Sequence, residues 1–337
     1  MMSILKSKES AVFALFVVVF ATFAVQTEKF ATSDNLFNVA RQYSELAVVS
    51  IGLTLVIITG GIDISVGSVV GLSSVLLGIF AIVFGLNIWI ACILAVLAGL
   101  ACGTINGLVI TKARVQPIVA TLAMMSAARG LAYALTEGYS RSGFPDSFVA
   151  LGQNAFGPIP WVGSIPYSVP VALALVIFGI VLLRRTALGR GIYAAGAAEE
   201  AARLSGMDVF RLKLFAYSLT GLLCGLGGVM MTARMASAVP DAGAGFEFEA
   251  ITAVVMGGSS LKGGEGNIVG TIIGVAVMAS LRNGLNLIGV QNIWQMLFLG
   301  VVLILAVLAD NVRMMIRSRR EVRYQTLPHR GVTNNAS

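Results

Sequence analysis

The chain has 337 residues, of which 57% are hydrophobic and only 12% are charged, and its mean hydropathy is +0.89. Soluble domains carry about 25% charged residues, so this composition excludes an ordinary soluble protein and indicates a polytopic membrane protein. The net charge of +7 does not point to nucleic acid, because the basic residues flank apolar runs, as topology signals do.

Ten apolar runs predict an all-α polytopic membrane protein with about ten transmembrane helices. Several runs are shorter than the ~20 residues of a straight span, so we expect some helices to be extended by flanking residues, broken or re-entrant. The first run resembles a signal peptide, but nine further runs favour an uncleaved first helix. The runs are Ala11–Val25, Leu46–Thr59, Ser68–Gly85, Ile88–Ile110, Ile118–Leu135, Val169–Leu183, Leu214–Thr232, Ala250–Gly258, Ile268–Leu281 and Ile293–Ala309.

The loops differ in basic residues, which predicts the orientation of the chain in the membrane. Arginine and lysine gather in residues 184–213, in the turn with Lys112 and Arg114, and in the tail at 311–337. The loops Glu137–Tyr167 and Ala233–Glu249 hold one arginine each. Ten spans with both termini in the cytoplasm place every basic segment inside. We therefore expect one permease domain over residues 1–310, followed by a basic cytoplasmic tail.

The stretch GGIDISVGS, residues 60–68, places Asp63 between two apolar runs. An acid at this depth could be a proton or ion site of a transporter, or it could contact substrate directly. The chain has one histidine, His329 in the tail, and the first five spans offer no second acid. We therefore favour a helix break at Gly60 and Gly61, in which Asp63 and Ser65 bond the freed backbone amides.

A second Gly-rich stretch, residues 253–270, echoes the first, and TINGLVI (104–110) is echoed by LRNGLNL (281–287). Paired broken helices in related halves are a habit of transporters, although glycine-rich membrane sequence can also look self-similar by chance. Arg129 and Arg282 lie at membrane depth and need partners or water. The candidates for helix breaks or the pathway are Gly60, Gly61, Asp63, Ser65, Gly67, Asn106, Arg129, Gly257, Gly258 and Asn283.

The loop at 184–213 contains AAEEAARLS, which predicts a short helix over Ala197–Ser205. Glu199 and Arg203 stand four residues apart and can pair, and Gly206 can end the helix in a left-handed conformation. Ala198, Ala201, Ala202 and Ser205 would form one face of small residues. Such a face is suited to docking into a partner's groove, whereas a helix lying on the bilayer needs large apolar side chains.

The segment Glu200-Ala201-Ala202 followed by Gly206 is similar to the cytoplasmic motif of ABC importer permeases. The stretches GGIDISVGS, 117–132, 233–271 and 283–290 extend this resemblance to the ribose-type simple-sugar permease group, which is related to the branched-chain amino acid permeases. The group usually carries asparagine before the motif, where this chain has Ala197 and Ala198, so the chain departs from the group at a helix-cap position. The resemblance implies an ATPase-coupling helix with Gly196, Glu199, Glu200, Ala201, Ala202, Arg203 and Gly206.

The resemblance implies a permease subunit that forms the pathway for a simple sugar, with ribose or a similar pentose expected. It implies that this chain lies in the bacterial inner membrane and has three partners: an ABC ATPase, a periplasmic or surface sugar-binding protein and a second permease chain, identical or related. The sequence contains no GxxxxGK[ST] motif, so ATP and Mg²⁺ would be bound by the separate ATPase, and no catalytic or metal site is expected here. The alternative is an ion-coupled carrier that works alone, against which the scarcity of membrane acids weighs. A membrane scaffold or receptor would leave the broken helices unexplained.

Overall fold

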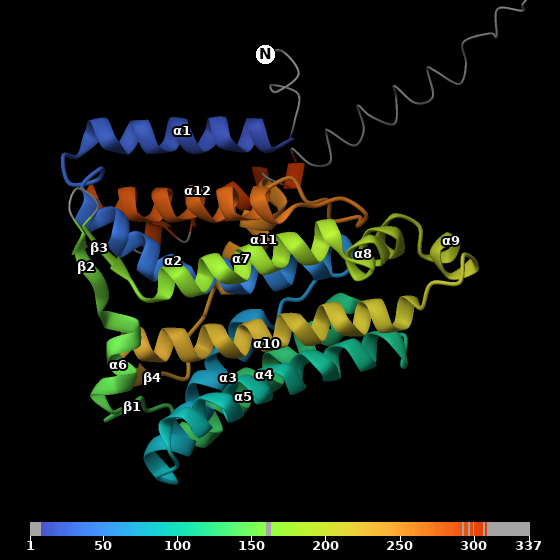
Figure 1. Cartoon of the computed structure of the whole chain (residues 1–337), viewed down its shortest axis with the longest axis horizontal. Helices are drawn as coiled ribbons and strands as arrows, with labels where there is room; N and C mark the ends of the chain where they lie inside the picture. The colour runs from blue at the N-terminus through green and yellow to red at the C-terminus, as the bar shows by residue number, and fades with distance from the viewer. Residues whose placement is uncertain are drawn as a thin grey trace, which may run out of the picture.

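The computed structural model describes residues 8–159, 163–291, 293–295, 297–298, 300–305 and 307–308. Within these residues, seven helices are long and apolar enough to cross a membrane. They run roughly side by side along the long axis of the molecule (Figure 1). The seven are α2 (Ser33–Ile58), α3 (Val66–Gly78, continued by a π-helical turn at Ile79–Val83), α4 (Ile88–Thr111), α5 (Pro117–Thr136), α7 (Ser168–Arg185), α10 (Val209–Met235) and α12 (Ile268–Leu287).

Two further helices correspond to predicted spans but are not among the seven: α1 (Lys8–Gln26), whose apolar part runs only over Ser10–Gln26, and α11 (Phe246–Met256). With 11 residues, α11 is too short to cross a bilayer, as expected for a broken or re-entrant segment. The predicted span at 293–309 lies partly outside the described residues, and the tail at 311–337 lies wholly outside them. A helical polytopic membrane protein is thus confirmed, whereas the count of ten spans stays a prediction.

The two ends of the bundle carry different structures (Figure 1). One end holds α6 (Asp146–Gln153), a hairpin of β2 (Ala155–Ile159) and β3 (Gly163–Pro166), and the antiparallel pair of β1 (Arg141–Ser142) with β4 (Ser237–Ala238). This pair joins the two loops in which the sequence is poor in basic residues. We call this the strand end. The opposite end holds α8 (Ala187–Ala197) and α9 (Glu199–Leu204), which come from the basic loop.

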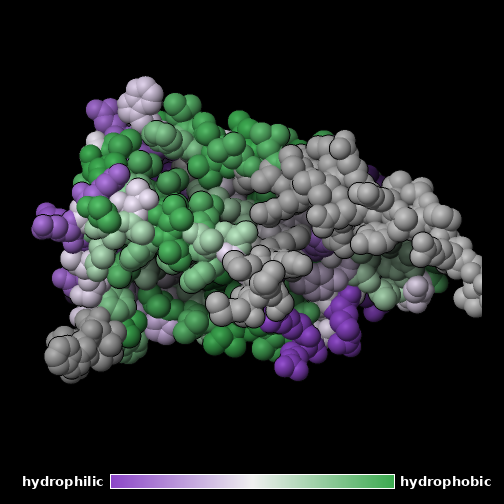
Figure 2. All heavy atoms as spheres, turned by 90° about the horizontal axis from the view of Figure 1, so that it is seen from above, coloured by the Kyte–Doolittle hydropathy of each residue, from purple (hydrophilic) through white to green (hydrophobic). Residues whose placement is uncertain are grey.

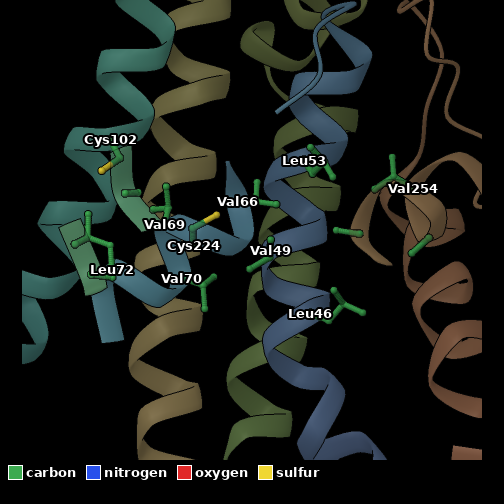
Figure 3. Packing of buried hydrophobic residues seen from close by; sticks show 14 of the residues in the cluster. Leu46, Val49, Leu53, Val66, Val69, Val70, Leu72, Cys102, Cys224 and Val254 are labelled. Carbon is green, nitrogen blue, oxygen red and sulfur yellow. The ribbon is translucent and has the colours of Figure 1, made fainter. Parts of the chain in front are cut away.

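The surface over α1 is largely hydrophobic, with hydrophilic side chains gathered toward the ends of the long axis (Figure 2). Inside the bundle, α2 is the most enclosed span, with 83% of its most apolar stretch buried. Leu46, Val49 and Leu53 of α2 lie in one cluster with side chains of α3, α4, α10 and α11, among them Val66, Cys102, Cys224 and Val254 (Figure 3). In a membrane such packing stabilises helix association through close contact rather than through removal from water.

Close approach of α4 and α10 explains part of the glycine content of the chain. A Cβ added to Gly99 would lie 2.7 Å from the Cα of Gly225, and one added to Gly221 would lie 2.7 Å from the Cα of Gly103. Because only hydrogen fits at these positions, the two backbones pack directly against each other.

Candidate functional site

The first predicted helix break is present where the sequence places it. The helix α2 ends at Ile58, and Gly60 adopts the left-handed conformation with φ +80°. The amide of Gly60 donates to the carbonyl of Ile57 (2.9 Å), and the amide of Gly61 donates to that of Val56 (3.1 Å). These two bonds form a Schellman motif, which satisfies carbonyls that the helix would otherwise leave open.

Asp63 lies in the extended segment between α2 and α3 and is 2% exposed. Its Oδ1 accepts hydrogen bonds from the amide (2.9 Å) and the hydroxyl (2.6 Å) of Ser65, the residue directly before α3. Asn106 of α4 donates to the same hydroxyl at 3.0 Å. The predicted bond from Asp63 to a freed amide is therefore confirmed. Ser65 was expected to act in the same way, but its side chain bonds Asp63 and Asn106 instead of capping the helix.

The second break, between α11 and α12, repeats the first. Gly258 has φ +96°, its amide donates to Val255 (2.9 Å), and the amide of Ser259 donates to Val254 (3.2 Å). The two Gly-rich stretches thus share a Schellman motif. The left-handed glycine is the first of the Gly-Gly pair in the first stretch (Gly60) and the second of the pair in the second stretch (Gly258). Gly257, the residue before, packs against Gly270 of α12 so closely that a Cβ would meet that backbone at 2.5 Å.

Both breaks meet the end of α8 in what we call the glycine junction, formed by residues 58–60, 196–197 and 263–264. The amide of Gly264 donates to the carbonyl of Ile58 at 2.8 Å. A Cβ on Gly196 would overlap the carbonyl oxygen of Ile58 and lie 2.6 Å from the nitrogen of Gly264. A Cβ on Gly263 would lie 2.8 Å from both the Cα of Gly60 and the carbonyl oxygen of Gly196. Three segments distant in sequence therefore touch backbone to backbone.

A side chain of α8 also bonds the backbone of the second break. The hydroxyl of Tyr193 donates to the carbonyl of Gly266 at 2.7 Å. Burial raises the pKa of Tyr193, partly offset by the nearby Arg184. Because the phenol stays protonated over the physiological range, this donor is retained. This hydrogen bond therefore joins α8 directly to the segment before α12.

The predicted coupling helix is shorter than expected and faces a different way. Helix α9 begins at Glu199 rather than Ala197, because α8 runs to Ala197 and Ala198 adopts a non-helical conformation between them. Ala202 is turned inward and is 5% exposed, so the expected face of four small residues is wrong. The exposed surface is instead formed by Glu200, Ala201, Ser205 and Leu204, whose exposure is 81%.

The charges on α9 also pair differently from the prediction. Glu199 bonds Lys213 of α10 at 2.7 Å, and Arg203 pairs with Glu200 at 2.9 Å, so the expected bond between Glu199 and Arg203 is not formed. Gly206 ends the helix with φ +82°, as predicted. The longer-range pair with Lys213 ties α9 to a membrane span, an arrangement that local spacing could not indicate.

Three arginines near the strand end have partners; the sequence places Arg129 and Arg282 at membrane depth and Arg234 in a loop. Arg282 of α12 pairs with the buried Glu249 of α11 at 2.9 Å, and Arg234 of α10 pairs with Glu45 of α2 at 2.7 Å. Arg129 of α5 donates to two backbone carbonyls, those of Pro240 (2.7 Å) and Ala242 (3.2 Å). The need for partners is confirmed, but sequence reasoning missed Glu45 and Glu249 as those partners.

The remaining candidates lie in separate places. A Cβ on Gly67, in the first turn of α3, would overlap the carbonyl oxygen of Gly243 and the side chain of Glu247, so Gly67 supports the same loop as Arg129. Asn283 exchanges hydrogen bonds with Asn35 of α2, at 2.8 and 3.1 Å. Asn283 thus joins α12 to the start of α2 and does not share the cluster of Asp63. Whether any candidate lines a pathway stays a prediction.

Comparison with known families agrees with this geometry. A family model described as the permease component of the branched-chain amino acid transport system matches residues 35–307. The chain belongs to this permease family. It is therefore a transport component rather than an enzyme, and the resemblance seen in its motifs is confirmed.

The similar members of this permease family are named for sugars. The ribose import permease protein of Escherichia coli (strain K12) is 42% identical over 313 residues, covering 90% of this chain and 94% of that protein. That of Bacillus subtilis (strain 168) is 43% identical over 296 residues, covering 88% and 90%. The L-arabinose ABC transporter permease protein of Azospirillum brasilense is 34% identical over 307 residues, covering 90% and 88%. No solved structure matches.

Proposed function

We propose that this chain forms the membrane pathway of a binding-protein-dependent ABC importer for a pentose, with ribose as the first substrate to test. The observation that carries the proposal is the identity of 42–43% with two ribose import permeases over about nine-tenths of the chain. The arabinose relative, at 34%, supports the wider class of pentoses.

The ATPase partner docks on α9, in this proposal, through Glu200, Ala201 and Leu204. A leucine that is 81% exposed next to small residues is suited to a groove in another protein. Closure of the ATPase on ATP would displace α9 and, with it, the end of α8. Because Gly196 touches Ile58 and Gly264 directly, the displacement reaches both helix breaks without an intervening flexible side chain. ATP and Mg²⁺ belong to the ATPase, and this chain contributes no cofactor.

The orientation follows from the same assignment. The coupling loop and both termini lie in the cytoplasm, the chain resides in the bacterial inner membrane, and the strand end faces outward. The sugar-binding protein would then deliver its ligand to the loops at 137–167 and 233–249, which are joined by the β1–β4 pair. A second permease chain, identical or related, completes the pathway.

The stimulation of ATP hydrolysis tests the proposal and its substrate together. The chain is co-expressed with the ATPase and the binding protein of its own transport system, and the ATPase rate of the purified complex is measured with the binding protein empty or loaded. We expect stimulation by binding protein loaded with ribose or another pentose. Stimulation by a hexose or a sugar alcohol alone would overturn the substrate class. A chain that fails to co-purify with the ATPase would overturn the whole assignment.

A further inference from the structure

A cavity of about 490 Å³ opens at the strand end between α2, α6, α7, α10 and the β2–β3 hairpin. This volume falls within the range of small-molecule and cofactor pockets. Its walls are almost entirely apolar and include Phe148, Leu226, Val229 and Met230. None of the candidate residues at the helix breaks lines this cavity.

Two buried oxygen atoms in the cavity lining have no hydrogen-bond partner. Glu45 is 1% exposed; its Oε1 accepts from Nε of Arg234 at 2.7 Å, whereas its Oε2 has no partner. The hydroxyl of Ser168, a residue 8% exposed, is likewise without a partner. Buried polar atoms are almost always bonded, so an unpartnered carboxylate oxygen beside a cavity indicates an occupant with a hydrogen-bond donor.

The chemistry of the walls restricts the class of molecule that can occupy the cavity. A sugar carries hydroxyls on every side and would lose their hydrogen bonds against these walls. The residues at the cavity's rim, among them Leu151, Phe156 and Val171, are apolar and 43–53% exposed. Apolar side chains therefore continue from the walls to the rim, and the cavity suits a hydrocarbon chain.

The polar atoms of the cavity lie where two of the spanning helices end. Ser168 is the first residue of α7, and Arg234 lies in the last turn of α10, where both spans end beside β3 and α6 (Figure 1). Arg234 also lines the cavity, and its side chain keeps 23% exposure. One acceptor and one guanidinium group thus lie side by side at the end of an apolar cavity.

We propose that this cavity binds an ethanolamine phospholipid of the bilayer. The ammonium group donates to Oε2 of Glu45, the phosphate faces the guanidinium of Arg234, and one acyl chain fills the space between α7 and α10. A choline headgroup has no N–H and cannot satisfy Glu45, so the site discriminates between the two zwitterionic lipids.

Native mass spectrometry of the full-length permease tests this directly. The detergent-purified protein is titrated with phosphatidylethanolamine or phosphatidylcholine that carries the same acyl chains. We expect about tenfold tighter binding of the ethanolamine lipid, the size expected for one hydrogen bond to a charged group. Glu45→Gln keeps an acceptor for Arg234 but turns an amide N–H toward the ligand, so it should abolish the preference.

A pair of substitutions on α7 tests the location. Val171→Trp places a large ring in the rim of the cavity and should release the bound lipid. Val181→Trp, on the same helix with similar exposure (48% against 44%) but outside the cavity lining, should leave binding unchanged. Equal affinity of the wild-type protein for the two lipids, as for a cavity holding only water, would overturn the proposal. An unchanged preference of Glu45→Gln for the ethanolamine lipid would also overturn it. Loss of the lipid when the permease dimerises would overturn it too, because a second copy of the chain would then be the occupant.

Discussion

Replacing Gly196 by alanine introduces a methyl group at the centre of the glycine junction. The added carbon overlaps the carbonyl oxygen of Ile58 and lies 2.6 Å from the nitrogen of Gly264, and both are backbone atoms that cannot rotate away. Overpacking of this kind costs about 1–3 kcal/mol. Loss of the hydrogen bond between Gly264 and Ile58 adds about 0.5–1.5 kcal/mol. The sum, about 1.5–4.5 kcal/mol, shifts an equilibrium by at least roughly tenfold.

We expect Gly196→Ala to separate α8 from the helix breaks while leaving the exposed surface of α9 intact. In proteoliposomes, sugar uptake should fall at least about tenfold, although the ATPase still binds and hydrolyses ATP. The assay compares uptake with ATP hydrolysis in the same vesicles, so that a change in coupling is separated from a change in the amount of complex.

Two matched controls separate loss of coupling from loss of stability. Gly103→Ala meets a comparable clash, because its Cβ would overlap the carbonyl oxygen of Tyr217 and lie 2.8 Å from the Cα of Gly221, but it lies between α4 and α10 and outside the residues of the junction. It should lower thermal stability and keep the ratio of sugar transported to ATP hydrolysed. Gly130→Ala meets no atom within 4 Å and should change neither. Normal coupling in Gly196→Ala, or an equal loss of coupling in Gly103→Ala, would refute the role of the junction.

Three further substitutions test other parts of the structure. Asp63→Asn keeps an acceptor for the amide of Ser65 and should largely retain uptake. Asp63→Leu leaves that amide unpartnered, at a cost of about 1–3 kcal/mol. Loss of uptake in the asparagine variant would instead indicate an obligate proton site. Glu200→Arg reverses a charge on the exposed face of α9 and should abolish ATP-driven uptake with normal membrane insertion, and unchanged coupled ATPase activity would show that α9 is not the docking surface. Glu249→Ala leaves Arg282 unpaired and should destabilise the protein by about 1–3 kcal/mol in a denaturation assay, less than for a fully buried pair because Arg282 keeps 33% exposure. Adding Arg282→Met to Glu249→Ala should recover part of that loss, and strictly additive effects would argue against the pair.

The sequence predicted local features better than distant contacts. Gly60 and Asp63 were identified because a left-handed glycine and a capping carboxylate act within a few residues of each other. The pair of Arg234 with Glu45 joins residues 189 positions apart, and no local pattern connects them. The need of Arg129 and Arg282 for partners was predictable, whereas Arg234 was assigned to a loop and its pairing depends on the packing of α2 against α10.

The coupling helix shows why a local pattern can mislead. Spacing alone favoured a bond between Glu199 and Arg203 and a free face containing Ala202. Tertiary contact decided otherwise, because Lys213 draws Glu199 toward α10 and Ala202 packs inward. Gly196 was expected in the coupling segment, but its contact with Ile58 depends on how α8 packs against the end of α2.

Sugar uptake by proteoliposomes, measured with ATP and with ion gradients in turn, tests most directly whether this permease is driven by an ATPase. The account predicts that labelled ribose or another pentose accumulates only when this chain, its ATPase and the loaded binding protein are present with ATP and Mg²⁺. Accumulation by this chain alone, driven by a proton or sodium gradient, would contradict it.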